Sequence, residues 1–366
     1  MPSYPREPAE KISKFGSSDV AWPTEAESPL SVIRGHFLVV AVIFDGMLIG
    51  SGMGGDAFEP SLTPRIFRFS DIDEFRSLVR SFSLDFTPLV RKISAEQTIL
   101  NLESCSVNLT KSFPRIVDAQ LAPDCTAIGF TMDDGVPIRF NGADRDKSVI
   151  VIGGGGAAYT TVERTERQYA SIVFTPAIAD RGWPQVSANF NMFETSPAAQ
   201  QRLRALVTQL LTALPQLGEQ PSLSETSAAI RESLLACIDG VLAEIIPARW
   251  ATLANSTRQF QVFREIRDVL EGSLGRPIYS EELAQQIGVS VRSMHDAILR
   301  YRGMSLHRYL RLRRLWLVRR QLLAGAESVK AIALAFGFWH LGDFSASYRL
   351  QFGETPSQTL AKSRQS

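Results

Sequence analysis

The side chains best suited to chemistry lie near the C-terminus, on two short predicted helices. Arg292 could offer the O6 and N7 atoms of guanine a two-donor fork, and His295 could read N7 of a purine. Asp296 could accept from N4 of cytosine, or only orient Arg292 or Arg300. Because the N-terminal half of such a helix reaches base edges, these residue types indicate base recognition. The candidate DNA-binding residues are Ser290, Arg292, Ser293, His295, Asp296, Arg300, His340, Gly342, Asp343, Ser345 and Arg349.

A short motif that occurs twice must position these side chains. Leu283-Ala284 is followed by Gly288, and Ile332-Ala333 is followed at the same interval by Gly337. The alanine lets two helices cross closely, and the glycine accepts a positive φ at the turn. Apolar anchors follow four residues apart and place one stripe of the second helix inward. The anchors are Met294 and Ile298 in the first copy, and Phe344 and Tyr348 in the second.

At these residues the chain resembles the C-terminal DNA-binding domain of the AraC/XylS family of bacterial transcription regulators. The resemblance covers roughly Phe260 to Leu360 and includes the terminal segment Gly353-Glu354-Thr355-Pro356-Ser357. It implies that the positions of Arg292, His295 and Asp296 read bases, although Asp296 departs from the Arg or Lys often found there. It also implies activation through contact with RNA polymerase, in response to an effector sensed by an N-terminal domain.

The second recognition helix carries fewer base-reading donors, since Leu341 and Gly342 stand where relatives carry polar side chains. We expect it to contribute phosphate contacts or shape readout more than sequence discrimination. Trp339 is expected to be a packing residue, with a contact to the DNA backbone as the alternative. The predicted phosphate contacts are Arg302, Arg313 and Arg314, and at least one of the last two should brace the helices.

A connecting helix over Ser305 to Leu323 would be about 28 Å long at 1.5 Å per residue. This length approaches one turn of B-DNA, about 34 Å. A rigid helix of this kind could hold both recognition helices in successive major-groove segments of one face of the duplex.

The net charge of +1 hides an asymmetry between the two ends of the chain. From Arg258 onward there are 17 Lys and Arg against 9 Asp and Glu, whereas the preceding part carries 22 against 29. A basic domain joined to a mildly acidic one fits a nucleic-acid reader attached to a sensor or partner domain. Three cysteines without metal-like spacing, and no signal peptide, favour the reducing cytoplasm.

The fold class predicted is multidomain α+β. An N-terminal antiparallel β barrel or sandwich, a helical connector and a C-terminal all-α double helix-turn-helix domain follow one another. Short apolar segments with turn signals between them, such as Asp134-Gly135, indicate the sheet, which resembles a cupin-like sensor domain. The predicted boundaries are 1–60 for a disordered or non-native extension, 61–195 for the sensor, 196–257 for the connector and 258–362 for the reader.

The predicted barrel contains no histidine, because the only four are His36, His295, His307 and His340. Metal-dependent barrels of this kind build their sites from imidazoles, so no metal, cofactor or catalytic residue is predicted. The sequence leaves open the alternative that the barrel holds a pocket for a small organic effector. Gly153 to Gly156 lacks the Lys-Ser/Thr of a phosphate loop and is interpreted as a wide turn between strands. The apolar run Phe37 to Phe44 is too short to span a bilayer.

Two amphipathic helices, Pro197 to Leu214 and Leu223 to Ile246, should connect sensor and reader, with Ala248 to Gln259 as a linker. They could form a homodimer contact, pack against the barrel, or do both. The sequence therefore predicts an effector-responsive activator that binds double-stranded promoter DNA, with no membrane partner. The alternatives are a ligand-independent dimeric DNA-binding or interaction protein and a barrel enzyme fused to a DNA-binding domain.

Overall fold

The computed structural model describes most of the chain from residue 60 onward. Residues 55–366 form one compact unit, and every contact below lies within it. The predictions for the extension, including the run Phe37 to Phe44, fall outside the described residues. These are 60–77, 81–133, 135, 137–145, 149–178, 181–184, 190–213, 222–245, 253–272, 279–326 and 328–364.

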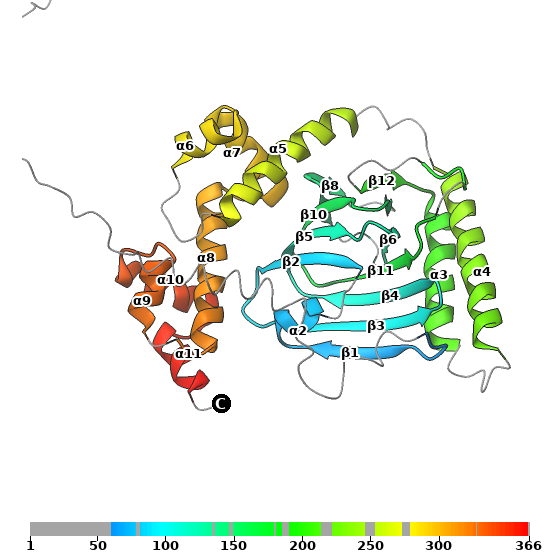
Figure 1. Ribbon diagram of the computed structural model, residues 1–366, viewed down its shortest axis with the longest axis horizontal. Helices are drawn as coiled ribbons and strands as arrows, with labels where there is room; N and C mark the ends of the chain where they lie inside the picture. The colour runs from blue at the N-terminus through cyan, green and yellow to red at the C-terminus, as the bar shows by residue number, and fades with distance from the viewer. Residues whose placement is uncertain are drawn as a thin grey trace, which may run out of the picture. The chain divides into compact units, whose positions relative to one another are not determined.

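Twelve strands of the described residues form two antiparallel sheets, stacked as a sandwich (Figure 1). The larger sheet has the order β1-β3-β4-β11-β6-β9-β12 and the smaller one the order β2-β5-β10-β7-β8. This confirms the antiparallel sandwich, whereas the likeness to cupins stays a prediction. The strands are β1 Arg65–Phe69, β2 Phe82–Pro88, β3 Ala95–Leu102, β4 Cys105–Ser112, β5 Arg115–Leu121, β6 Thr126–Thr131, β7 Ile138–Phe140, β8 Ala143–Arg145, β9 Val149–Gly153, β10 Ala158–Glu163, β11 Arg167–Phe174 and β12 Asn191–Glu194.

The strands follow one another through short turns. A tight turn after Leu102 separates β3 from β4, which pair antiparallel. Strand β10 was not predicted, although it lies inside the smaller sheet between β5 and β7. The interpretation of the glycine run as a turn agrees with the structure. A Cβ atom at Gly155 would lie 1.9 Å from the carbonyl oxygen of Pro123, so only glycine fits there.

Among the described residues, three helices accompany the sandwich: α2 (Ile72–Ser77), α3 (Pro197–Ala213) and α4 (Leu223–Ala243). Leu203 and Val207 of α3 and Leu234 of α4 are buried in one cluster with Ile128 and Ile172 of the larger sheet. The two helices therefore pack against this sheet, as one of the two predicted roles requires. A role in dimerisation stays a prediction.

The described residues of the C-terminal part form seven helices, and the two recognition units have separate apolar cores. The first helix begins at Leu253, so the described end of the predicted linker is helical. The connecting helix, α8, ends at the predicted Leu323 and begins one residue after the predicted Ser305, which is its N-cap. The helices are α5 Leu253–Glu271, α6 Ser280–Ile287, α7 Val291–Arg302, α8 Leu306–Leu323, α9 Val329–Ala335, α10 Leu341–Phe352 and α11 Pro356–Ser363.

Candidate functional site

Two helix-turn-helix units, α6–α7 and α9–α10, have the turn geometry that the duplicated motif requires. Gly288 and Gly337 have φ angles of 73° and 76°, a region that side chains disfavour. Ala284 and Ala333 are buried where the paired helices meet. The Ser290 side chain accepts a hydrogen bond from the Ser293 amide at 3.1 Å and caps α7.

The two recognition helices, α7 and α10, share one pattern of burial. Met294 and Ile298 are buried on α7, as are Phe344 and Tyr348 at the matching positions of α10. This confirms the predicted inner stripes. All the predicted DNA-binding residues are exposed, and their contacts with DNA stay predictions. They are Ser290, Arg292, Ser293, His295, Asp296 and Arg300 on the first unit, and His340, Gly342, Asp343, Ser345 and Arg349 on the second.

The exposed face of α7 carries loosely held polar groups. Arg292 Nε lies 3.9 Å from Asp296 Oδ2 and both side chains are largely exposed, so this pair restrains Arg292 only weakly. Nε2 of His295 is 3.2 Å from the Ser280 hydroxyl. Arg300 lies at the other end of the helix and bonds Gln259. The polar side chains nearest the N-terminal end of α7 are therefore the ones available to reach a base edge.

Arg302 does not agree with its predicted role as a phosphate contact. Its side chain is fully buried, and it donates to both carboxylate oxygens of Asp118 on β5, at 3.0 and 2.7 Å. It also donates to the Thr160 hydroxyl on β10 at 2.7 Å. Burial alone would raise the pKa of Asp118, but the charge and hydrogen bonds of Arg302 outweigh it and lower that pKa. In this arrangement Arg302 has no access to phosphate.

The other two predicted phosphate contacts are partly buried. Arg313 forms an ion pair with Asp85 and donates to the Thr87 hydroxyl at 3.2 Å, which joins α8 to β2. Burial lowers the pKa of Arg314. Arg313 is thus a bracing residue, as expected for one of this pair, but it braces α8 against the sandwich rather than against another helix. The prediction that Trp339 packs is wrong, since it is 61% exposed.

Arginines of the sandwich region also donate to the C-terminal ends of both recognition helices. Arg139 donates to the carbonyls of Leu299 and Arg300 at 3.1 and 3.3 Å, and Arg164 to that of Gly303 at 3.1 Å. Arg91 donates to the Leu350 carbonyl at 2.8 Å.

A positive charge is stabilised at the C-terminal end of a helix, because the last carbonyls have no hydrogen-bond partner within the helix and carry partial negative charge. Sequence reasoning missed this contact surface. The signal it could have used is Asp118, an acidic residue in the middle of β5 between the apolar Val117 and Ala119.

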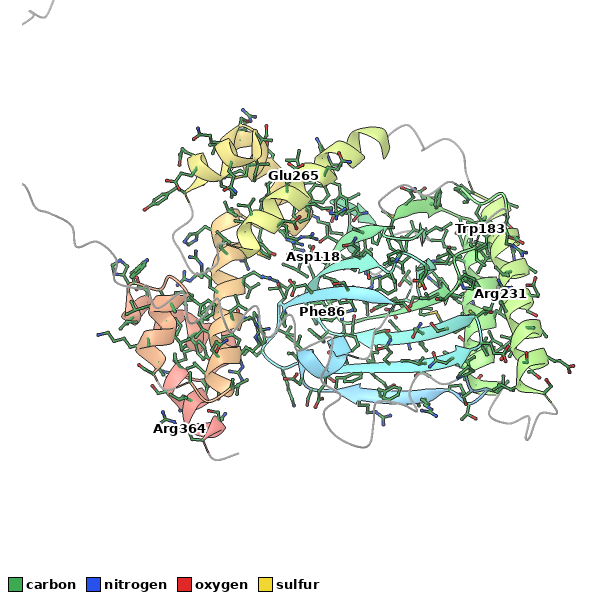
Figure 2. The ribbon with its side chains drawn as sticks, viewed as in Figure 1. Phe86, Asp118, Trp183, Arg231, Glu265 and Arg364 are labelled. Atoms are coloured by element: carbon green, nitrogen blue, oxygen red, sulfur yellow. The ribbon has the colours of Figure 1, made fainter. Side chains whose placement is uncertain are left out.

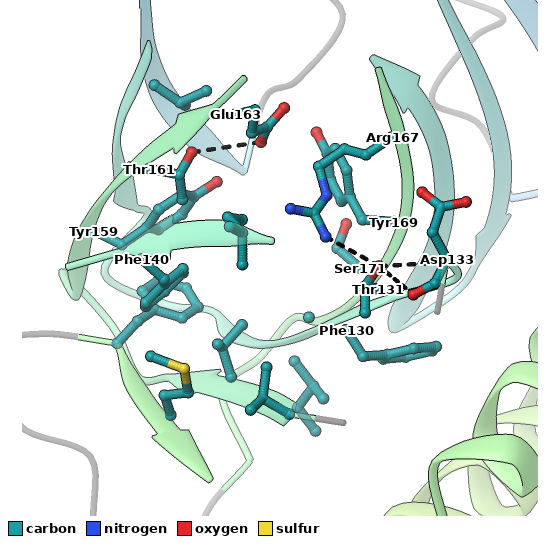
Figure 3. A pocket seen from close by; sticks show the side chains of 18 of the residues that line it. Phe130, Thr131, Asp133, Phe140, Tyr159, Thr161, Glu163, Arg167, Tyr169 and Ser171 are labelled. Atoms are coloured by element: carbon teal, nitrogen blue, oxygen red, sulfur yellow. Dashed lines mark hydrogen bonds between the residues drawn. The ribbon is translucent and has the colours of Figure 1, made fainter. Parts of the chain in front are cut away.

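A cavity of about 490 Å³ lies inside the sandwich, walled by both sheets (Figure 3). Most of its wall is aromatic or aliphatic, as in small-molecule sites. Three arginines reach it, namely Arg115, Arg167 and Arg204. Within the described ranges, no three His, Cys, Asp or Glu side chains gather in a way that could hold a metal ion.

Comparison with known proteins places the C-terminal domain in a family. Residues 283–362 match the family described as a helix-turn-helix domain. A XylDLEGF operon transcriptional activator of Pseudomonas putida is 38% identical over 101 residues, 27% of this chain and 32% of that protein. A probable thc operon regulatory protein of Rhodococcus erythropolis is 34% identical over 96 residues, 25% of this chain and 29% of that one.

Among solved structures, a probable AraC family transcriptional regulator from Rhodopseudomonas palustris is 36% identical. The match covers 28% of this chain and 97% of that one, with a TM-score of 0.27. The C-terminal part of the chain is therefore a helix-turn-helix domain similar to those of AraC/XylS-type transcription regulators. The alignment spans about a third of the length of the P. putida relative. None of the described helices is long and apolar enough to cross a membrane.

Proposed function

We propose that the chain is an effector-responsive activator whose sandwich restrains the DNA-binding domain until a ligand enters the cavity. One observation carries this proposal: two neighbouring strands, β5 and β10, line the cavity with one face and hold the DNA-binding domain with the other. Successive side chains of a strand point to opposite faces. A ligand on one face can therefore move the groups on the other without any intermediate element.

Strand β10 shows this alternation residue by residue. Tyr159, Thr161 and Glu163 line the cavity, whereas Ala158 and Val162 are buried in one cluster with Met294, Ile298 and Tyr301 of α7. On β5, Arg115 and Val117 line the cavity. The residues between them, Ile116 and Asp118, contact the DNA-binding domain.

Release of the DNA-binding domain would expose further positive charge. With the contacts to Asp118 and Asp85 broken, Arg302 and Arg313 could reach phosphate, as the sequence predicts. The eleven exposed candidate residues on and next to α7 and α10 would then engage double-stranded promoter DNA, with phosphate contacts fixing the register. RNA polymerase is the partner that an activator of this kind would contact, and the bacterial cytoplasm is where it would meet both.

The proposal also includes a homodimer formed through the outer faces of α3 and α4. The inner faces of these helices are buried against the larger sheet, so only the outer faces are open to a second copy. Measurement of the molar mass by light scattering on the full chain tests this part separately.

The test of function is DNA binding by the full chain with and without small organic compounds. Promoter fragments bound in vivo are mapped first, and affinity for one fragment is then measured by fluorescence anisotropy. We expect a compound that raises the thermal midpoint of the sandwich also to tighten specific DNA binding, and affinity to fall steeply with salt. Compounds that bind without any effect on DNA affinity would favour the ligand-independent interaction protein. Turnover of a bound compound would favour the enzyme.

A further inference from the structure

One arginine in the cavity lacks the partners that buried arginines ordinarily have. Arg167 of β11 is 4% exposed, and its Nη2 atom donates to the Thr131 hydroxyl at 3.1 Å. Its Nε and Nη1 atoms are buried and have no hydrogen-bond partner. Figure 3 shows its guanidinium reaching among the lining side chains between Thr161 on one side and Thr131 on the other. Buried polar groups are nearly always hydrogen-bonded, so this donor set points to an acceptor from outside the chain.

The carboxylates nearby are already engaged by other groups. Glu163 accepts from Arg115 Nε at 3.2 Å and from the Ser112 hydroxyl at 2.8 Å. Asp133 accepts from the backbone amide of Gln168 at 2.5 Å. Burial lowers the pKa of Arg167, because the charges of Glu163 and Asp133 do not offset its loss of solvent.

The third arginine of the cavity, Arg204, differs from Arg167 in being well bonded. It donates to the backbone carbonyls of Thr131 at 2.8 Å and Asp133 at 3.2 Å. Arg115 has Glu163 and the Tyr169 hydroxyl, at 3.0 Å from its Nη2 atom. Of the three, Arg167 has the most buried nitrogens without a hydrogen-bond partner in the described part of the chain.

The rest of the wall says what else a ligand must carry. Apart from its charged and hydroxyl side chains, the lining of the cavity is largely aromatic and aliphatic. It includes the side chains of Phe82, Phe130, Phe140, Val149, Val151 and Phe190. A ligand that fits both parts has an apolar body and one anionic end. A planar guanidinium matches a carboxylate, which accepts two parallel hydrogen bonds from it.

We infer that the cavity binds an organic carboxylate with an apolar body, whose carboxylate pairs with the guanidinium of Arg167. This inference rests on the proposed function, since it names the ligand class of that same cavity. The two unpaired nitrogens have almost no exposed surface. The guanidinium therefore turns about its terminal bonds to meet the ligand, which shifts side chains that line β5 and β10.

The binding test uses calorimetry on the full chain with two acids, hexanoate and 3-phenylpropionate, and the primary amide of each. Each amide keeps the apolar body and loses the charge. We expect at least one acid to bind at least about tenfold tighter than its amide, and Arg167→Met to abolish that preference. Acids that bind no better than their amides overturn the inference. So do acids that all bind more weakly than about 1 mM.

A second readout separates a ligand-binding arginine from a structural brace. Arg167→Met should leave the melting temperature of the ligand-free protein unchanged or raise it, because it removes a buried guanidinium with two unpaired nitrogens. The matched control, Arg204→Met, should lower it, because it removes bonds to two partly buried carbonyls. If Arg167→Met lowers the melting temperature as much as the control, Arg167 is a brace and the inference fails.

The two proposals fail in different ways. Acids that bind through Arg167 but leave DNA affinity unchanged would refute the proposed regulation and keep the ligand class. Amides or neutral compounds that bind and tighten DNA binding would refute the ligand class and keep the regulation.

Discussion

The ion pair between Asp118 and Arg302 allows a direct test of restraint by the sandwich. Asp118, labelled in Figure 2, lies on β5, so its substitution removes no side chain of the DNA-binding domain. Asp118→Ala leaves a fully buried guanidinium without its carboxylate and removes hydrogen bonds of 2.7 and 3.0 Å. The cost falls on the contact between the two regions, because Asp118 belongs to the sandwich and Arg302 to the DNA-binding domain.

Breaking a buried pair by removing one partner typically costs about 3–5 kcal/mol. We expect a cost near the lower end of this range. The Thr160 hydroxyl still accepts a hydrogen bond from Arg302, and water can reach the guanidinium once the two regions separate. A change of about 3 kcal/mol lowers the population of the restrained state relative to the released state by about a hundredfold. Apparent affinity for DNA is proportional to the fraction of molecules in the binding-competent, released state. The apparent DNA affinity of the variant should therefore rise by up to about a hundredfold.

Fluorescence anisotropy on a specific promoter fragment, without effector, measures this gain, and small-angle scattering reports whether the variant expands. Glu96→Gln is the control, since it breaks an exposed pair with Arg68 at 2.7 Å on the larger sheet. An exposed pair contributes about 0–1 kcal/mol, so the control should bind DNA as the unmodified protein does. If Asp118→Ala gains no affinity and does not expand, restraint through this ion pair is refuted.

Three further predictions concern single sites. Arg292→Ala should weaken specific binding by about 1–3 kcal/mol and relax preference at one base pair; equal loss on random DNA would make it a phosphate contact. Burial would raise the pKa of Glu354, but hydrogen bonds from Lys362, Arg319 and Thr359 hold it at about 2 instead of 4.5. The ionised Glu354 carboxylate therefore adds on the order of 1–2 kcal/mol to the free energy of unfolding. This stabilisation is complete above pH 4.5 and is lost as the pH falls toward 2. Acid unfolding of Glu354→Gln should lack this component. Burial raises the pKa of Cys105 to about 12, so a thiol reagent at pH 8 should label it only after denaturant is added.

The DNA-binding domain could be predicted almost entirely from the sequence because its determinants are local. A glycine fixes each turn, an alanine each helix crossing, and anchors four residues apart each inner face, as at Gly288, Ala284 and Met294. The predicted exposed set on α7 and α10 followed from the same spacing, since helical periodicity decides which side chains face outward. None of these inferences required knowledge of what the domain touches.

The contact with the sandwich could not be predicted in this way. A charged group such as Arg302, at the end of a recognition helix and in a basic domain, has the sequence signature of a phosphate contact. Its partner Asp118 lies far away along the chain, and nothing local to either residue specifies the pairing. The same holds for β10, whose flanking glycines mark a turn but whose place between β5 and β7 depends on long-range pairing.

The alternation along β10 bears on how signal transfer could work at all. A strand has a side-chain period of two, so a shift of register by one residue would exchange the faces. Thr161 and Glu163 would then meet the DNA-binding domain, and Thr160 and Val162 the cavity. The pairing of Thr161 with Val117 and of Thr160 with Asp118 fixes the register between β10 and β5. Coupling therefore requires only that a ligand alter the spacing or twist of these two strands, because Asp118 and Thr160 hold the same guanidinium and respond together.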